Sequence, residues 1–240
     1  MWNIAKKEWF QFFNSLTGYI ALAVFLLING LLLFVFPSTS LLDFGYASLS
    51  PFFNLAPWVL LFLVPVVTMR SLAEEYKSGT FEILKTLPLT EAQIIRGKFL
   101  GNFLTTAVAL VPTVIYAFSI QGLAVTGGID IGSTAGSYLG LLLLAATYTA
   151  IGICASSFTN NTVIAFIVAA FTSLILFTGF DALSQLSYLQ NTMGYYISLF
   201  GISFHYKSIS RGVVDARDII YFISLIALCL FITQQNIKRR

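Results

Sequence analysis

The ionisable side chains of this sequence gather in residues 69–101, whereas most of the remaining chain is apolar. Nine of the 23 charged residues lie there, namely Arg70, Glu74, Glu75, Lys77, Glu82, Lys85, Glu91, Arg96 and Lys98. Carboxylate and cationic groups at this density can form charge-assisted hydrogen bonds with one another or with a partner protein. In a chain that is apolar elsewhere, such a segment is expected to work on an aqueous side of a membrane.

Other side chains that could support chemistry are sparse. His205 is the only histidine, and no cysteine lies near it in the sequence to complete a metal site. We interpret it as an interfacial histidine in an aromatic loop. Cys154 and Cys229 lie inside apolar runs, which is typical of buried thiols rather than of a disulfide framework. We therefore predict no catalytic residue, no metal and no cofactor bound by this chain.

Two function classes are disfavoured by what the sequence lacks. It has no Gly-x4-Gly-Lys-Ser/Thr phosphate-binding loop, so we do not expect it to bind ATP in the usual way. The centres of its apolar runs hold no Asp, Glu, Lys or Arg, whereas ion-coupled transporters usually keep an ionisable relay there. If the protein moves a substrate, the energy is expected to enter through residues 69–101.

The turn-forming residues of this segment predict folded structure rather than a flexible tether. Gly79 can adopt the left-handed conformation that ends a helix. Thr80 can cap the next helix, and Pro88 can stop it. Thr90 and Gln93 have the spacing of a capping box that opens a third helix.

Composition and hydropathy predict an all-α integral membrane protein. The chain is 58% hydrophobic and 10% charged, whereas a soluble domain carries about 25% charged residues. A spanning helix needs about 20 apolar residues. Six runs approach this length: Gly18–Phe36, Phe52–Met69, Phe99–Ile120, Ala135–Ser156, Val163–Phe180 and Ile219–Thr233. Residues 1–240 are expected to form one membrane domain, and the net charge of +3 does not predict a nucleic-acid partner.

The basic residues predict that both chain ends lie in the cytoplasm. Ten of the 13 Lys and Arg residues fall before the first run, between the second and third, or after the sixth. The loops at 37–51 and 121–134 have none, as expected of the outer side. Lys207, Arg211 and Arg217 depart from the rule, although Asp215 and Asp218 lie beside two of them.

Four further features accompany the six runs. Residues 1–16 contain an amphipathic pattern, with an apolar stripe at Trp2, Ala5, Trp9, Phe12, Phe13 and Leu16. We predict a helix lying in the membrane interface, with an extension of the first span as the alternative. Residues 181–218 predict a re-entrant or interfacial helix pair, and Pro112 predicts a kink. The pairs Gly97/Gly101 and Gly136/Gly140 permit close helix approach, within the chain or between chains.

The charged segment resembles the conserved cytoplasmic segment of ABC-2 type permeases, the membrane subunits of a class of ATP-driven exporters. In that family an acidic residue, Ser/Gly-Thr, Glu, Leu, Pro, Ser/Thr and Gly-Lys recur at this spacing. The matching residues are Glu74, Glu75, Gly79, Thr80, Glu82, Leu84, Pro88, Leu89, Thr90, Gly97 and Lys98. The resemblance implies that residues 70–98 form a coupling segment that docks into a groove on a separate nucleotide-binding subunit.

Within this family the chain most resembles the permeases of gliding-motility-associated transporters. The phrases that carry this are Gly18–Ile20, Leu49–Trp58, Pro65–Ser71 and Tyr148–Gly152. The resemblance implies a location in the bacterial cytoplasmic membrane and an interface between permeases along the second and fifth spans. It also implies a second, related permease subunit and two copies of an ATPase subunit that binds the ATP and Mg²⁺. Two alternatives to a permease are a membrane scaffold that recruits a different partner and a lipid-modifying enzyme.

The ATPase-coupling residues predicted here include an apolar face on the short helix that starts at Thr80. Three side chains on neighbouring turns make this face: Phe81, Leu84 and Leu87. We predict that it docks into a pocket of the ATPase, while Glu74 and Glu75 pair with basic residues there. The alternative is that the face rests on lipid or on the ends of the protein's own spans.

Overall fold

The computed structural model describes residues 1–36, 48–86, 88–124, 128–186 and 192–239. Six helical segments in this part of the chain are long and apolar enough to cross a membrane, which confirms the predicted fold class. They are Leu16–Phe34, Ser50–Ser78, Glu91–Leu123, Ile131–Phe158, Thr162–Ser184 and Ala216–Arg239. The sixth extends beyond its predicted apolar run at both ends.

The helices, in chain order, include several that are shorter than a span. The first half of the chain contains α1 (Trp2–Phe13), α2 (Leu16–Phe34), α3 (Ser50–Thr68), α4 (Ala73–Ser78), α5 (Thr80–Lys85), α6 (Glu91–Leu110) and α7 (Val114–Leu123). The second half contains α8 (Ile131–Phe158), α9 (Thr162–Leu174), α10 (Phe180–Ser184), α11 (Thr192–Ser198), α12 (Ile202–Ile209) and α13 (Ala216–Arg239). A 3₁₀ turn at Val111–Thr113, which contains Pro112, joins α6 to α7 where the kink was predicted, and a π-helical turn at Ile175–Gly179 follows α9.

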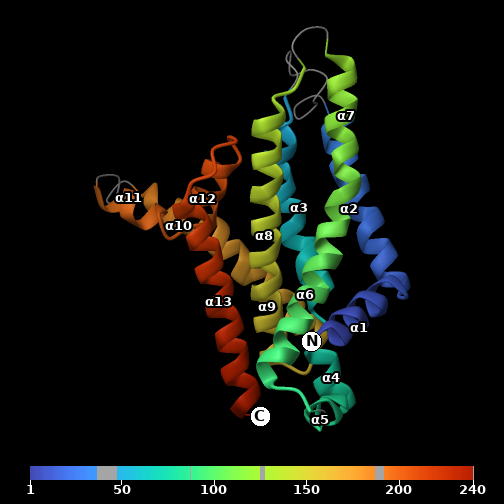
Figure 1. The fold of residues 1–240 in the computed structure, drawn as a ribbon. Helices are drawn as coiled ribbons and strands as arrows, with labels where there is room; N and C mark the ends of the chain where they lie inside the picture. Colours follow the sequence, from blue (N-terminus) through green and yellow to red (C-terminus); the bar gives the residue numbers. More distant parts are fainter. Residues whose placement is uncertain (37–47, 87, 125–127, 187–191, 240) are drawn as a thin grey trace.

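The two chain termini lie at the same end of the bundle, together with α1, α4 and α5 (Figure 1). We call this the basal end. The helices α10, α11 and α12 lie in the other half of the molecule, beside the top of α13. The two short helices that the charged segment forms, α4 and α5, therefore lie at the basal end.

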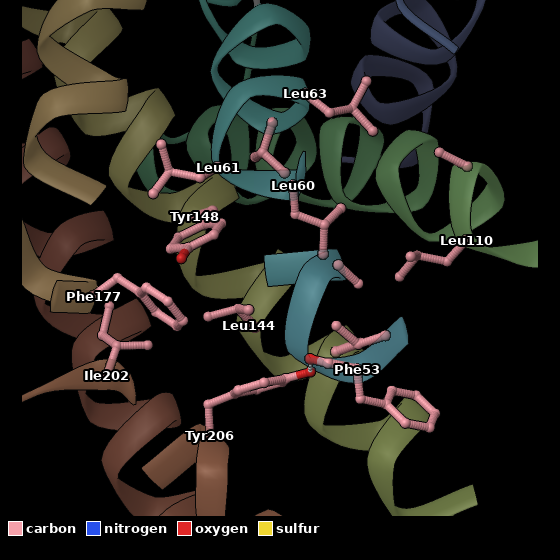
Figure 2. Close-up of a cluster of buried hydrophobic side chains, with 14 of the residues drawn as sticks. Phe53, Leu60, Leu61, Leu63, Leu110, Leu144, Tyr148, Phe177, Ile202 and Tyr206 are labelled. Carbon is pink, nitrogen blue, oxygen red and sulfur yellow. Dashed lines mark hydrogen bonds between the residues drawn. The ribbon is translucent and has the colours of Figure 1, made fainter. Parts of the chain in front are cut away.

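The centre of the bundle is α8. Of its most apolar stretch, 78% of the residues are buried inside the protein, against 17% in α13. Small side chains on α8 let α3 approach it closely, because a Cβ at Gly152 would collide with the hydroxyl of Thr68. Figure 2 shows Leu60 and Leu61 of α3 beside Leu144 and Tyr148 of α8 in the resulting core.

A proline inside α3 explains one contact between this core and α12. Pro57 has no N–H group, so the carbonyl of Phe53, one turn earlier, loses its helical donor. The hydroxyl of Tyr206 on α12 donates to that carbonyl at 2.7 Å (Figure 2). Burial raises the pKa of the Tyr206 hydroxyl above its ordinary value.

In the described part of the predicted re-entrant segment, α10 continues the fifth span, and α11 and α12 are two further helices that are too short to span a membrane. Asp181 of α10 accepts hydrogen bonds from Ser203 at 2.5 Å and Lys207 at 2.7 Å on α12. Lys207 therefore has a carboxylate partner, one that the sequence did not indicate. The carboxylate of Asp218, expected beside Arg217, instead lies 2.7 Å from the ring of His205.

Candidate coupling site at the basal end

Within the predicted coupling segment, residues 73–85 form two short helices joined by one glycine, and the first turns of α6 follow from Glu91. Gly79 has a φ of 70°, the left-handed conformation that was predicted, and it ends α4. Because α5 follows immediately, Gly79 itself occupies the capping position, so the predicted cap by Thr80 is wrong. The hydroxyl of Thr80 lies 2.8 Å from that of Ser78 instead. The capping box of Thr90 and Gln93 at the start of α6 is confirmed.

A serine on α8 fixes the start of α4. The backbone N–H groups of Leu72 and Ala73 donate to the Ser156 hydroxyl oxygen at 3.0 and 2.9 Å. The same hydroxyl donates to the carbonyl of Met69 at 3.2 Å. These contacts satisfy donors that a helix start leaves free. They join residues more than 80 positions apart, so no local pattern in the sequence indicates them.

A buried lysine, Lys98 on α6, links the coupling segment to α1. Its ammonium group lies 2.7 Å from Glu8 of α1 and 2.9 Å from Glu75 of α4, and it donates to the carbonyl of Ser71 at 2.6 Å. The ammonium thus donates hydrogen bonds to Glu8 and Ser71 and forms an ion pair with Glu75. The Lys98 side chain has 0% exposed surface. We call Glu8, Ser71, Glu75 and Lys98 the Lys98 cluster.

The Lys98 cluster changes the predicted role of Glu75. The prediction places both Glu74 and Glu75 against basic residues of a partner. In the structure the carboxylate of Glu75 is occupied inside the chain, by Lys98 and by Lys7 at 2.8 Å. The carboxylate of Glu74 lies 4.0 Å from Arg70, and its side chain is partly exposed. Of the two acids, Glu74 is thus the one whose side chain remains partly exposed.

The helix α1 is separate from α2, so the alternative of an extended first span is wrong. Ser15 caps the start of α2 by accepting from the N–H of Gly18 at 3.1 Å. The face of α1 that packs inside the protein consists of Ile4, Ala5 and Glu8, whereas Trp2 of the predicted apolar stripe is 57% exposed. The inward face of α1 therefore includes an acidic residue, Glu8, which the hydrophobic pattern of the sequence did not predict.

Gly97 and Gly101 allow α1 to lie against α6. A Cβ at Gly101 would lie 2.7 Å from the carbonyl oxygen of Ala5 and 2.7 Å from Glu8 Cβ. A Cβ at Gly97 would lie 2.9 Å from the Cβ of Ile4. The second pair, Gly136 and Gly140, similarly faces residues 206–212. Both small-residue pairs therefore serve packing within the chain.

The apolar face of α5 turns toward the protein. Phe81 and Leu84 are buried in a cluster with Leu72, Ile94 and Ile95. The structure has the face resting on the protein's own helix ends, which was the alternative, so the prediction that these side chains enter a partner's pocket is wrong. Leu87, the third residue of the predicted face, lies outside the described residues.

The outer edge of α5 carries the accessible side chains of the segment. Ile83 is 66% exposed, and four polar or turn residues around it are also exposed: Thr80, Glu82, Lys85 and Pro88. Beside α4, Lys77 and residues 158–161 of the α8–α9 turn line a recess of about 420 Å³. The sequence did not single out this turn. Together, the edge of α5 and the recess form an exposed, mixed apolar and polar surface at the basal end, which we call the basal surface.

The described residues show no group of three or more His, Cys, Asp or Glu side chains that could hold a metal ion. His205 is buried, stacks on Tyr221 with ring centres 3.9 Å apart, and lies 2.9 Å from the carbonyl of Leu199. Its contacts join α12 to α13. They describe a packed structural histidine rather than one at an open interface.

Comparison with known proteins identifies the family of this chain. Residues 49–233 match the profile of a family described as ABC-2 family transporter protein. The matched region starts just before α3 and ends within α13, so it includes the whole coupling segment. No curated protein matches the chain.

Proposed function

Because this chain belongs to the ABC-2 transporter family, it is a multi-pass membrane component of an ABC transporter, and we propose that it is a permease subunit driven by a separate ATPase. ATP and Mg²⁺ would bind to that ATPase. The basal surface would receive the movement of the ATPase and pass it to the spans through α4, α5 and α6.

One observation carries this proposal: α5 is held firmly from inside and exposed along its outer edge. Phe81 and Leu84 anchor it in the protein, and Ser156 fixes the preceding helix α4. Ile83 and the charged residues Glu82 and Lys85 face outward. A docking helix must be exposed in order to contact its partner. It must also be anchored in the protein, because a loosely held helix would move by itself and would not transmit the partner's movement to the spans.

The proposed orientation places the basal end in the cytoplasm, where an ATPase can reach it. Its support is the distribution of basic residues, which precede the first span, lie between the second and third, and follow the sixth. The membrane would be the bacterial cytoplasmic membrane. The complete transporter would contain a second, related permease and two ATPase copies.

We further propose that the transporter belongs to the gliding-motility-associated group. This narrower assignment rests on four phrases of the sequence, Gly18–Ile20, Leu49–Trp58, Pro65–Ser71 and Tyr148–Gly152. Deletion of the gene in a gliding bacterium tests it. Loss of gliding, restored by the wild-type chain, is the expected result, and unimpaired gliding would contradict the narrower assignment alone.

Co-purification and ATP hydrolysis test the permease role. The chain is expressed in membranes together with an ABC ATPase that has no spans of its own. We expect the ATPase to co-purify and to hydrolyse ATP faster when the chain is present in lipid. An ATPase that binds with no change in its rate would favour the scaffold alternative, and an ATPase that does not bind would contradict the permease role.

A further inference from the structure

The Lys98 cluster places three separate parts of the chain around one ammonium group. Glu8 comes from α1, Glu75 from α4, and the carbonyl of Ser71 from the turn between α3 and α4. The side chain of Lys98 has no exposed surface, so water cannot replace a contact that is lost while the cluster stays closed. If one of these three partners is lost, no other group replaces its contact with the ammonium group.

We propose that Lys98 is a positioning residue through which α1 sets the position of the coupling helices α4 and α5. If α1 moved away, Glu8 would leave Lys98 buried with an unfilled donor and one carboxylate. A buried charge that loses its partner is strongly unfavourable, as is a buried donor without an acceptor. The structure therefore favours movement of α1 and α4 together over movement of either alone.

The packing around the Lys98 cluster supports this role. The absence of side chains at Gly97 and Gly101 lets α1 approach closely enough for Glu8 to reach Lys98. Asn102, one turn further along α6, donates to the Glu8 carboxylate at 3.4 Å and to the Ser71 hydroxyl at 3.2 Å. It thus orients one group from α1 and one from the coupling segment.

The outer side of α1 makes the membrane surface the natural source of such movement. Trp2 and Phe10 are each 57% exposed, and side chains of this kind enter the boundary between headgroups and acyl chains. A change in the depth of α1 would then reach the Lys98 cluster and α5. The docking role of α5 rests on the proposed function, whereas the link between α1 and α4 does not.

Hydrogen exchange of the full-length protein in lipid nanodiscs tests the link without any ATPase. Glu8→Gln keeps the shape of the side chain but removes its charge, and it lies on α1. We expect amide exchange in residues 72–86 to become at least several-fold faster. Glu82→Gln, the same chemical change on the exposed edge of α5, is the matched control and should leave these rates unchanged.

A double-mutant cycle separates positioning from general loosening. In a Lys98→Met background, Glu8→Gln should cause no further increase in exchange at residues 72–86, because its effect passes through Lys98. Three results would overturn the proposal: unchanged exchange in Glu8→Gln, additive effects of the two substitutions, or an equal increase in residues 141–151 of α8. None of these readouts depends on an ATPase, so failure of the proposed function would be recognised separately.

Discussion

A buried lysine is tolerated only when its charge is paired and each of its N–H groups has an acceptor. Lys98 is paired with the carboxylates of Glu8 and Glu75 and donates hydrogen bonds to Glu8 and to the carbonyl of Ser71. Such an arrangement does not have to add stability compared with an apolar core, but removal of one partner is costly. We therefore expect a substitution of Lys98 to lower the stability of the protein more than a substitution of an exposed lysine nearby.

Lys98→Met should destabilise the protein by about 3–5 kcal/mol, because Glu8 and Glu75 would remain as buried carboxylates without this partner. Thermal unfolding of the protein in a mild detergent measures the change. Lys77→Met is the matched control, since the side chain of Lys77 is exposed and should contribute within about 0.5 kcal/mol. Equal midpoints for Lys98→Met and the wild type would contradict the importance of the cluster.

Tyr206→Phe tests the contact at the proline of α3. The substitution removes the hydroxyl that donates to the Phe53 carbonyl, and Pro57 cannot replace it. A buried carbonyl left without a donor costs about 1–3 kcal/mol, which the same unfolding measurement would show. Tyr195→Phe, at an exposed tyrosine of α11, should change stability little; equal losses in the two variants would refute this explanation.

Residue-scale features were predictable where their causes are local. Gly79, Pro112 and the capping box of Thr90 and Gln93 act on backbone within four residues, so the sequence alone indicates them. The bonds from Ser156 to residues 72 and 73, and from Lys98 to Glu8, join positions 83 to 90 apart. One sequence contains no signal for which distant polar groups will meet.

At the scale of elements, the helical period predicts that a helix is amphipathic but not what its apolar face contacts. The face of α5 was predicted correctly as apolar, yet Phe81 and Leu84 face the chain's own helices. In α1 the inward face contains Glu8 because its carboxylate pairs with Lys98 of α6. Hydropathy assigns such a carboxylate to the outside, and only the arrangement of neighbouring helices corrects this.

Ile83→Asp separates docking of α5 from its folding. Ile83 is exposed on the outer edge, so the variant should remain as stable as the wild type. If this edge meets an ATPase, an apolar contact replaced by a charge should cost at least about 1 kcal/mol, a several-fold loss of affinity. Co-purification with the ATPase, together with a titration of its ATP hydrolysis, measures this.

Phe81→Asp also tests α5, but it disrupts the buried anchor of the helix rather than its exposed edge. It buries a carboxylate beside Leu84 and the ring of Tyr76, whose centre lies 4.8 Å from that of Phe81. We expect weaker ATPase binding together with faster proteolysis of residues 72–86, because α5 would detach from the protein. Normal retention and stimulation of the ATPase in both Ile83→Asp and Phe81→Asp would exclude α5 from the docking surface.

At the scale of the whole molecule, hydropathy was sufficient to count the spans, because crossing a membrane requires long apolar helices. It did not indicate that α8 would be central. That position follows from the small side chains of α8, which admit neighbours on several sides. Because every span is apolar, hydropathy does not distinguish a helix that contacts lipid from one that contacts protein. The sizes of the side chains on the helix surface decide which neighbours can pack against it.

The proposed sidedness of the molecule rests on its basic residues and can be measured by labelling. Lys77→Cys lies at the basal end, and Ser48→Cys precedes α3 at the opposite end of that span. With the basal end in the cytoplasm, a membrane-impermeant maleimide applied to intact cells should label Ser48→Cys and miss Lys77→Cys. The reverse pattern of labelling would overturn the orientation.

The remaining question at this scale is which lateral face meets a second permease. The family resemblance predicts the face of the second and fifth spans, which correspond to α3 and α9. In the structure α3 is largely interior, but Trp58 and Phe62 are exposed, and Trp58 packs edge-to-face on Phe177 in the turn after α9. Exposed side chains of α9, among them Ile167 and Phe171, extend the apolar surface.

A photoreactive amino acid placed at Phe62 or Ile167 should therefore crosslink to the second permease in the assembled transporter. The same probe at Phe118, an exposed residue of α7 on the third span, should react with lipid instead. This contrast uses three apolar, exposed positions, so hydrophobicity alone cannot produce it. Crosslinks between permeases from Phe118, with none from Phe62 or Ile167, would place the interface on the third span and contradict the prediction.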